Sequence, residues 1–165
     1  MCEGKVIDVT SASDTSDFDF VQVLNSIQAK WRCFDPESGI RSQLVGLGTY
    51  PGGVDIRAFE EVGLLSQIKM EDGMSYVQFS NITINERIRY YVTVKIINGA
   101  GRKRTVYSDG IMIDVTSPTV SPTYIRDGLR GKDTNYSSEQ FSFSAHWQQA
   151  FMDAESGIDE FRVGL

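Results

Sequence analysis

Apolar and polar residues alternate one by one in several short segments of the chain, most clearly in residues 27–31 and 90–96. A period of two is the mark of a β-strand with one face turned to a core and the other turned to solvent. We therefore predict strands in these segments, with their polar residues, such as Lys30, on the outer face. The apolar rows consist of Ile27, Ala29, Trp31, Tyr90, Val92, Val94 and Ile96.

Turn-forming residues separate the predicted strands. Asp35-Pro36-Glu37-Ser38-Gly39 and Thr49-Tyr50-Pro51-Gly52-Gly53 predict turns, and Asn98-Gly99-Ala100-Gly101 predicts a hairpin. Asp109-Gly110 predicts a bend or bulge within the last strand. The segment Ala58–Val62 has some helical character but is short and precedes Gly63, so we interpret it as a turn or an edge segment. About seven short strands without helices predict an all-β fold with two packed sheets.

The chain contains an internal repeat, which is visible when residues 27–47 are compared with residues 143–165. Trp31 corresponds to Trp147, the letters ESGI occur at 37–40 and at 155–158, and the letters VGL close both segments. The period is about 116–118 residues. Agreement of these letters in one order indicates two copies of one structural unit.

The repeat divides the chain into a first unit, residues 1–117, and the start of a second, residues 118–165. Prolines near the boundary, Pro118 and Pro122, suit a link between units because proline fixes φ and donates no hydrogen bond. We expect the second unit to be truncated, since it lacks the equivalents of the strands that close the first. Its apolar residues should then be poorly ordered or exposed. These residues are Phe141, Phe143, Trp147, Phe161 and Val163.

The predicted structural core follows from the alternation and the repeat. It consists of Trp31, Tyr90, Val92, Val94, Ile96 and Trp147. Gln43 stands where the second unit has the apolar Phe161, so one core contact is expected to differ between the units.

Charge and composition exclude some classes of partner. The net charge is −6, which argues against a nucleic-acid or anionic-membrane surface because both require a basic face. The chain has no apolar run of the ~20 residues that span a bilayer and no apolar signal segment near its start. Of the two cysteines, we interpret Cys33 as a buried free thiol, with a Cys2–Cys33 disulfide as the alternative.

Candidate chemistry is sparse. Asp14, Asp17 and Asp19 offer oxygen ligands for calcium, but the EF-hand pattern is absent and we assign no metal or other cofactor. We expect the Asp35 carboxylate to accept backbone N–H bonds within its turn. The single histidine, His146, has no nucleophile placed beside it by any motif, so the chain is not expected to be an enzyme.

Two tripeptides match the acceptor pattern for N-glycosylation. They are Asn81-Ile82-Thr83 and Asn135-Tyr136-Ser137. Each pattern is weak alone, and ordinary loop asparagines are the alternative interpretation of both.

The segment 90–101, with Tyr-x-Val-x-Val-x-Ile-x-Asn-x-Ala-Gly, resembles strand F and the following turn of fibronectin type III domains. Trp31 resembles the buried tryptophan of strand B in that family, and Tyr90 resembles the tyrosine at the corner entering strand F. The run from Trp31 through the DPESGI and GTYPGGVD segments resembles the tandem fibronectin-like modules of large animal extracellular and cell-surface proteins. The resemblance covers residues 1–117 nearly whole and residues 118–165 in part.

This resemblance implies an immunoglobulin-like (fibronectin type III) β-sandwich outside the cell or on the outer side of the plasma membrane. It implies a non-catalytic adhesion or spacer module that acts through protein–protein contacts, with neighbouring tandem domains and without insertion into the membrane. Two alternatives stay open: a ligand-binding ectodomain module of a receptor, and a carbohydrate-binding accessory module of a secreted enzyme. Tyr50 and Tyr107 are the candidate aromatic residues for the latter.

Overall fold

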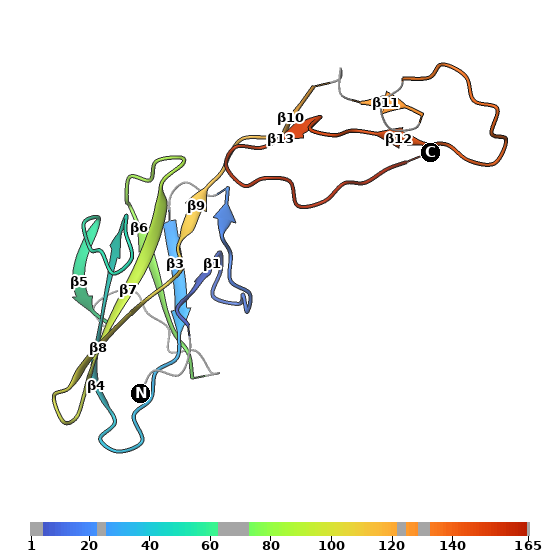
Figure 1. Ribbon diagram of the computed structural model, residues 1–165. Coiled ribbons are helices and arrows are strands. Elements are labelled where there is room, and N and C mark those ends of the chain that lie inside the picture. The colour runs from blue at the N-terminus through green and yellow to red at the C-terminus, as the bar shows by residue number, and fades with distance from the viewer. Residues whose placement is uncertain (1–4, 23–25, 63–72, 122–124, 129–132, 165) are drawn as a thin grey trace. The chain divides into compact units, whose positions relative to one another are not determined.

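The computed structural model describes residues 5–22, 26–62, 73–121, 125–128 and 133–164. The chain forms two compact units, Met1–Val115 and Thr116–Leu165. All regular structure in the described residues is β-strand (Figure 1). The described part of the chain contains no helix with the length and hydrophobicity that a membrane span requires.

One sheet of the first unit has three antiparallel strands in the order β1-β3-β6. They are β1 (Ile7–Val9), β3 (Ser26–Trp31) and β6 (Ser75–Ser80). The central strand, β3, contains the first predicted alternation. Its partner β6 pairs with it over its whole length, from Ser26 opposite Ser80 to Trp31 opposite Ser75.

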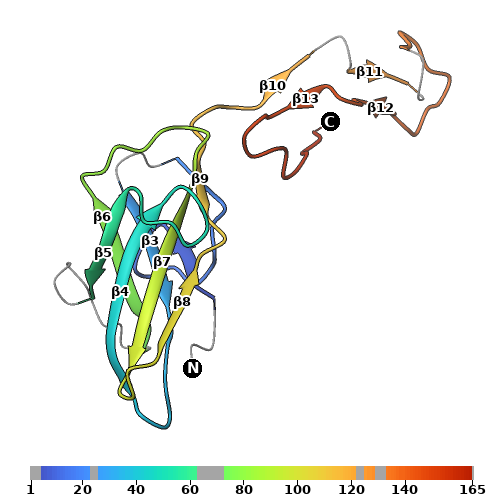
Figure 2. The same cartoon turned by 60° about the vertical axis from the view of Figure 1, so that its left-hand side comes forward.

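The other sheet has the order β2-β9-β7-β4-β5, and β8 also pairs with β7. Its strands are β2 (Phe20–Val21), β4 (Ile40–Gly48), β5 (Arg57–Glu61), β7 (Arg89–Asn98), β8 (Lys103–Tyr107) and β9 (Ile111–Ile113). Figure 2 shows β4, β7 and β8 side by side, with β5 at the edge beyond β4. Neighbouring strands are antiparallel except β2 and β9, which are parallel.

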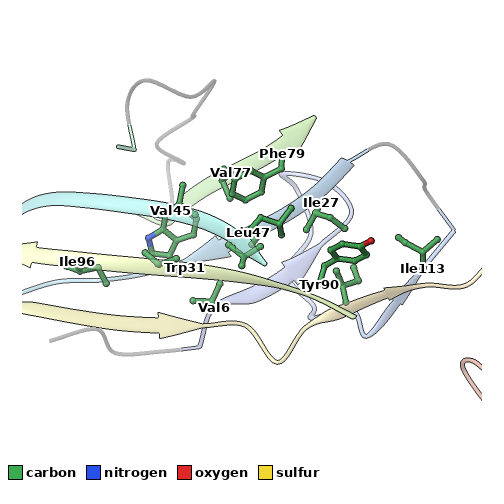
Figure 3. Packing of buried hydrophobic residues seen from close by; sticks show 14 residues of the cluster. Val6, Ile27, Trp31, Val45, Leu47, Val77, Phe79, Tyr90, Ile96 and Ile113 are labelled. Carbon is green, nitrogen blue, oxygen red and sulfur yellow. The ribbon is translucent and has the colours of Figure 1, made fainter. Parts of the chain in front are cut away.

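The core lies between these two sheets, and Figure 3 shows the Trp31 and Tyr90 rings among aliphatic side chains from both. The first unit is therefore an all-β sandwich. Trp31 and Tyr90 are each 1% exposed, and Val92, Val94 and Ile96 belong to the same buried cluster. The other members are Val6, Ile27, Ala29, Val45, Leu47, Val77, Phe79, Ile111 and Ile113.

The turns and breaks lie where the sequence predicts them. Asn98 and Arg102 close the β7–β8 hairpin, with the Asn98 N–H donating to the Arg102 carbonyl at 3.0 Å. Gly110, at φ +94°, separates β8 from β9. The segment Ala58–Val62 is not helical, and most of it lies in the edge strand β5.

Lys30 departs from the expectation that it lies on an exposed face, because it is only 1% exposed. Its Nζ donates to the carbonyl oxygen of Asp14, at 2.9 Å, in the segment between β1 and β2. Alternation tells which side of the sheet a residue takes. It does not tell whether another segment covers that side.

Cys33 is disulfide-bonded, so its interpretation as a free thiol is wrong. The other cysteine of the chain, Cys2, lies outside the described residues. The spacing of two cysteines carries no information on pairing, because pairing depends on how close the folded chain brings them.

The second unit contains two short antiparallel pairs. Strand β10 (Thr119–Val120) pairs with β13 (Phe151–Met152), and β11 (Arg126–Asp127) pairs with β12 (Ala145–His146). In the segment that corresponds to β3 by the repeat, only Ala145–His146 forms a strand.

Trp147 is half-buried, which lies between the core position predicted from its correspondence to Trp31 and the exposure expected of a truncated unit. Its ring packs on that of Phe161, with the centroids 6.0 Å apart. Phe141 and Phe143 are 98% and 88% exposed, as we expected for this segment. Within the described residues of this unit, no second layer covers these rings, so alternation alone does not bury them.

The substitution Trp31→Ala should be strongly destabilising, because it empties the centre of the core. Truncation of a buried tryptophan costs about 3–5 kcal/mol. Denaturant unfolding followed by circular dichroism measures the loss, with Tyr107→Ala as the matched control, since Tyr107 is 51% exposed. We expect the control to change the free energy of unfolding by no more than about 0.5 kcal/mol. A loss for Trp31→Ala as small as that of the control would contradict the central role of this side chain.

Candidate functional site

The Asp35 turn connects the two sheets of the first unit. The Asp35 Oδ1 atom accepts the backbone N–H groups of Glu37, at 3.0 Å, and Ser38, at 2.8 Å. The turn ends at Gly39, whose φ of +67° favours glycine. This arrangement confirms the prediction that the Asp35 carboxylate holds its own turn together.

The second unit builds the same turn around Asp153. The Asp153 Oδ1 atom accepts the backbone N–H groups of Glu155, at 3.0 Å, and Ser156, at 2.8 Å. Gly157 follows at φ +75°. The repeated letters of the sequence therefore encode a repeated local structure.

The tryptophans of the two units also have corresponding partners. The Trp31 Nε1 atom donates a hydrogen bond to Gln43 Oε1 at 2.6 Å. Phe161, which stands at the corresponding position of the second unit, packs on the ring of Trp147. The predicted difference at this contact is thus a change from a hydrogen bond to a ring contact between the same two positions.

The Asp35 turn is fastened to the β7–β8 hairpin. Asn98 Nδ2 donates to Asp35 Oδ2 at 3.0 Å, and the Gly99 N–H donates to the Gly39 carbonyl at 3.1 Å. Bonds from the Ser38 N–H, the Asn98 amide and the Glu37 N–H lower the pKa of Asp35 to about 2. The hairpin and the turn therefore form one connected end of the sandwich.

The loop between β4 and β5 lies flat on the outer face of the sheet. Gly46 and Gly48 make this close approach possible, because a Cβ at either position would clash with Val54 or Gly53. Thr93 Oγ1 donates to the Gly53 carbonyl at 3.1 Å and is fully buried beneath the loop. The loop is thus held to the sheet by contact and by hydrogen bonding.

Two exposed tyrosines lie at this loop. Tyr50 is 57% exposed and its ring borders Gly53, and Tyr107 is 51% exposed, with its ring 3.8 Å from where a Cβ at Gly52 would lie. The sequence did not group these two rings, because Tyr107 lies far along the chain on β8. Pairing of Tyr107 with Thr93 explains their proximity, since Thr93 is the residue bonded to Gly53.

The corner before β7 is held by a side-chain hydrogen bond. The hydroxyl oxygen of Tyr90 accepts the backbone N–H of Asn85 at 2.8 Å. The ring itself is buried in the core. Tyr90 therefore anchors the segment that connects β6 and β7 to the interior of the sandwich.

The three clustered aspartates that we weighed as calcium ligands take separate roles. Asp14 accepts bonds from the N–H and hydroxyl groups of Thr10 and Ser11, and Asp19 lies 3.4 Å from Arg89. Only Asp17 faces other carboxylates, those of Asp8 and Asp109.

Asp8 is a fully buried carboxylate that the sequence did not single out. Burial raises the pKa of Asp8 to about 7, and the negative charges of Asp17 and Asp109 add to the effect. Bonds from Ser108 and the Gly110 N–H oppose the increase. Strand β1 has only three residues, so its alternation of polar and apolar residues was too short to predict the burial of Asp8.

The remaining candidate residues lie apart from one another. Asn81 follows β6 with an exposed side chain at φ +54°, and Asn135 lies in an exposed segment of the second unit. His146 is half-buried, with Nδ1 3.4 Å from the Gly128 carbonyl oxygen. The expectation that the chain has no catalytic function stays a prediction.

No family model, curated protein or solved structure matches this chain.

The Asp35 turn should make the first unit sensitive to acid. An aspartate in the unfolded chain titrates near pH 3.9, whereas the pKa of folded Asp35 is about 2. The stabilisation is therefore fully present above pH ~4 and is lost as the pH falls from ~4 through ~2. Urea unfolding at a series of pH values in this window should show a weaker pH dependence for Asp35→Asn than for the wild type.

Glu37→Gln is the matched control, because it makes the same charge change in the same turn at an exposed side chain. It should keep the acid dependence of the wild type. Equal pH dependence in the wild type and Asp35→Asn would show that the carboxylate of Asp35 does not stabilise the fold.

Proposed function

We propose that this chain is part of a non-catalytic, extracellular array of fibronectin type III-like modules that acts in adhesion or spacing through protein–protein contacts. The observation that carries the proposal is the repeated structure around Asp35 and Asp153, each with a tryptophan upstream. Repetition of one module along a chain is typical of an extended protein that acts as a spacer or offers a large surface for binding other proteins.

Two structural details support the fibronectin type III-like assignment. The sheets contain β1-β3-β6 on one side and β4, β7, β8 and β9 on the other, as expected for an immunoglobulin-like sandwich. The Tyr90 hydroxyl bonds to backbone five residues upstream at the entry to β7, which is the arrangement of a tyrosine corner.

Three residues support an extracellular location: one is the disulfide-bonded Cys33 and two are exposed glycosylation acceptors. Cys33 is disulfide-bonded, and disulfides persist mainly in oxidising compartments. Both asparagines of the glycosylation patterns, Asn81 and Asn135, are exposed and therefore accessible for modification.

The exposed pair Tyr50 and Tyr107 favours carbohydrate binding as the second candidate function. Exposed aromatic rings offer flat apolar faces against which a sugar ring can stack. Both rings border one loop that is fixed to the sheet, so their spacing is set by the fold.

Expression through a eukaryotic secretory pathway tests the location and the acceptor residues. We expect the secreted protein to lose mass when its N-glycans are removed enzymatically. Each of the variants Asn81→Gln and Asn135→Gln should show a smaller loss, because it lacks the glycan at that residue. Mass spectrometry of the intact protein measures the change. Secreted protein without N-glycans at either residue would remove this support for an extracellular role.

A cell-attachment assay separates the two candidate functions. Surfaces coated with the folded protein should hold more cells than surfaces coated with the Trp31→Ala variant. If attachment depends on protein–protein contacts, protease treatment of the cells should abolish it and enzymatic removal of their glycans should not. Loss of attachment on glycan removal, and in the Tyr50→Ser/Tyr107→Ser variant, would favour carbohydrate binding. Equal attachment to the folded and destabilised proteins would contradict adhesion by this chain.

A further inference from the structure

Three carboxylates, two from the N-terminal part of the first unit and one about a hundred residues later, converge on one side of that unit. Asp8 lies on β1, Asp17 lies between β1 and β2, and Asp109 lies at the break between β8 and β9. One carboxylate oxygen from each lies within 4.8 Å of the other two. A calcium ion bound at 2.3–2.6 Å from each ligand holds oxygens at this separation or closer.

The buried member of this cluster has an unsatisfied oxygen. Asp8 is 0% exposed, and its Oδ1 atom has no hydrogen-bond partner, the single such case among buried side-chain atoms of the described residues. Its Oδ2 atom accepts the Gly110 N–H at 3.1 Å. A buried oxygen without a partner is costly, and here it belongs to a carboxylate that already faces two others.

Lys5 supplies only part of the positive charge that the cluster requires. Its Nζ lies 2.5 Å from Asp17 Oδ2 and 2.5 Å from Asp109 Oδ2. The three carboxylates and one ammonium leave a formal charge of −2 when all are ionised. The Lys5 side chain is 53% exposed, so it can leave the cluster without disturbing the core.

We propose that Asp8, Asp17 and Asp109 form a divalent-cation site that takes Ca²⁺, with the ion replacing the ammonium group of Lys5. An all-oxygen set of carboxylates selects Ca²⁺, Mg²⁺ or Mn²⁺ over metals that prefer nitrogen or sulfur. Ca²⁺ is favoured because it accepts irregular geometry, whereas Mg²⁺ demands a near-ideal octahedron. Water and backbone carbonyls would complete the six to eight ligands that Ca²⁺ takes.

The site has a structural consequence that is independent of any adhesive function. A bound ion would join β1 and the β1–β2 segment to the break before β9, and so connect the two sheets along one side. Because an ion bound only by the folded state stabilises it, calcium should raise the temperature of unfolding.

Titration of the full chain with CaCl₂, followed by calorimetry and by thermal unfolding, tests the proposal. We expect saturable binding with Kd of about 10⁻⁴–10⁻³ M, the range of extracellular modules, and unfolding that shifts upward by several degrees. MgCl₂ at equal ionic strength controls for screening by salt. Failure to detect saturable Ca²⁺ binding in the wild type would overturn the site and would leave the attachment experiment unaffected.

Two variants assign the binding to these residues. Asp109→Asn should weaken Ca²⁺ binding about tenfold or more, and Asp109 is exposed, so the fold should be retained. Asp19→Asn is the matched control, because its carboxylate faces Arg89 and not the cluster. Equal weakening in both variants would show a non-specific effect of charge and would overturn the assignment.

Lys5→Gln tests the replacement of the ammonium group directly. Removal of the competing cation should tighten Ca²⁺ binding relative to the wild type, because the ion no longer has to displace Lys5. An affinity that is unchanged or weaker in Lys5→Gln would contradict the replacement.

Discussion

Burial of the Trp31 indole between the two sheets is the constraint on which the first unit depends. The ring occupies the centre of the core, and a polar group at that depth requires a partner. Gln43 provides it from β4, on the opposite sheet. One side chain thus fixes both the spacing of the sheets and the alignment of β3 with β4. The Asp35 turn between these strands sets the same alignment from outside the core.

Local patterns in the sequence were sufficient to predict β3 and β7, their buried rows and the turns of the first unit, but they did not single out β1, β2 or β6. Residues 90–96 alternate cleanly, and the carboxylate of Asp35 needs only its next neighbours to form a turn. Lys30 and Cys33 were interpreted wrongly for one common reason. Their surroundings depend on which distant segment lies over them, and a period of two contains no such information.

The candidate sites illustrate the same limit. The sequence located the exposed asparagines and named Tyr50 and Tyr107, but it did not place the two rings at one loop. It singled out Asp17 with the wrong companions, because residues close in sequence were the only ones that could be compared. Asp8 and Asp109 meet Asp17 only after the chain has folded into two sheets. A site that requires Asp109, about a hundred residues further along the chain, leaves no spacing to recognise.

The parallel pairing of β2 and β9 has a mechanical consequence for a protein under tension. The chain enters β2 at one end of the pair and leaves β9 at the other, since parallel strands point the same way. Tension that reaches these strands would pull them past each other. The bonds from Met112 N–H to Asp19 and from Asp114 N–H to Val21 would then carry the load together, in shear, and would not open one after another. A module joined in this way resists extension along its length better than an antiparallel pair of the same size that is peeled open from one end.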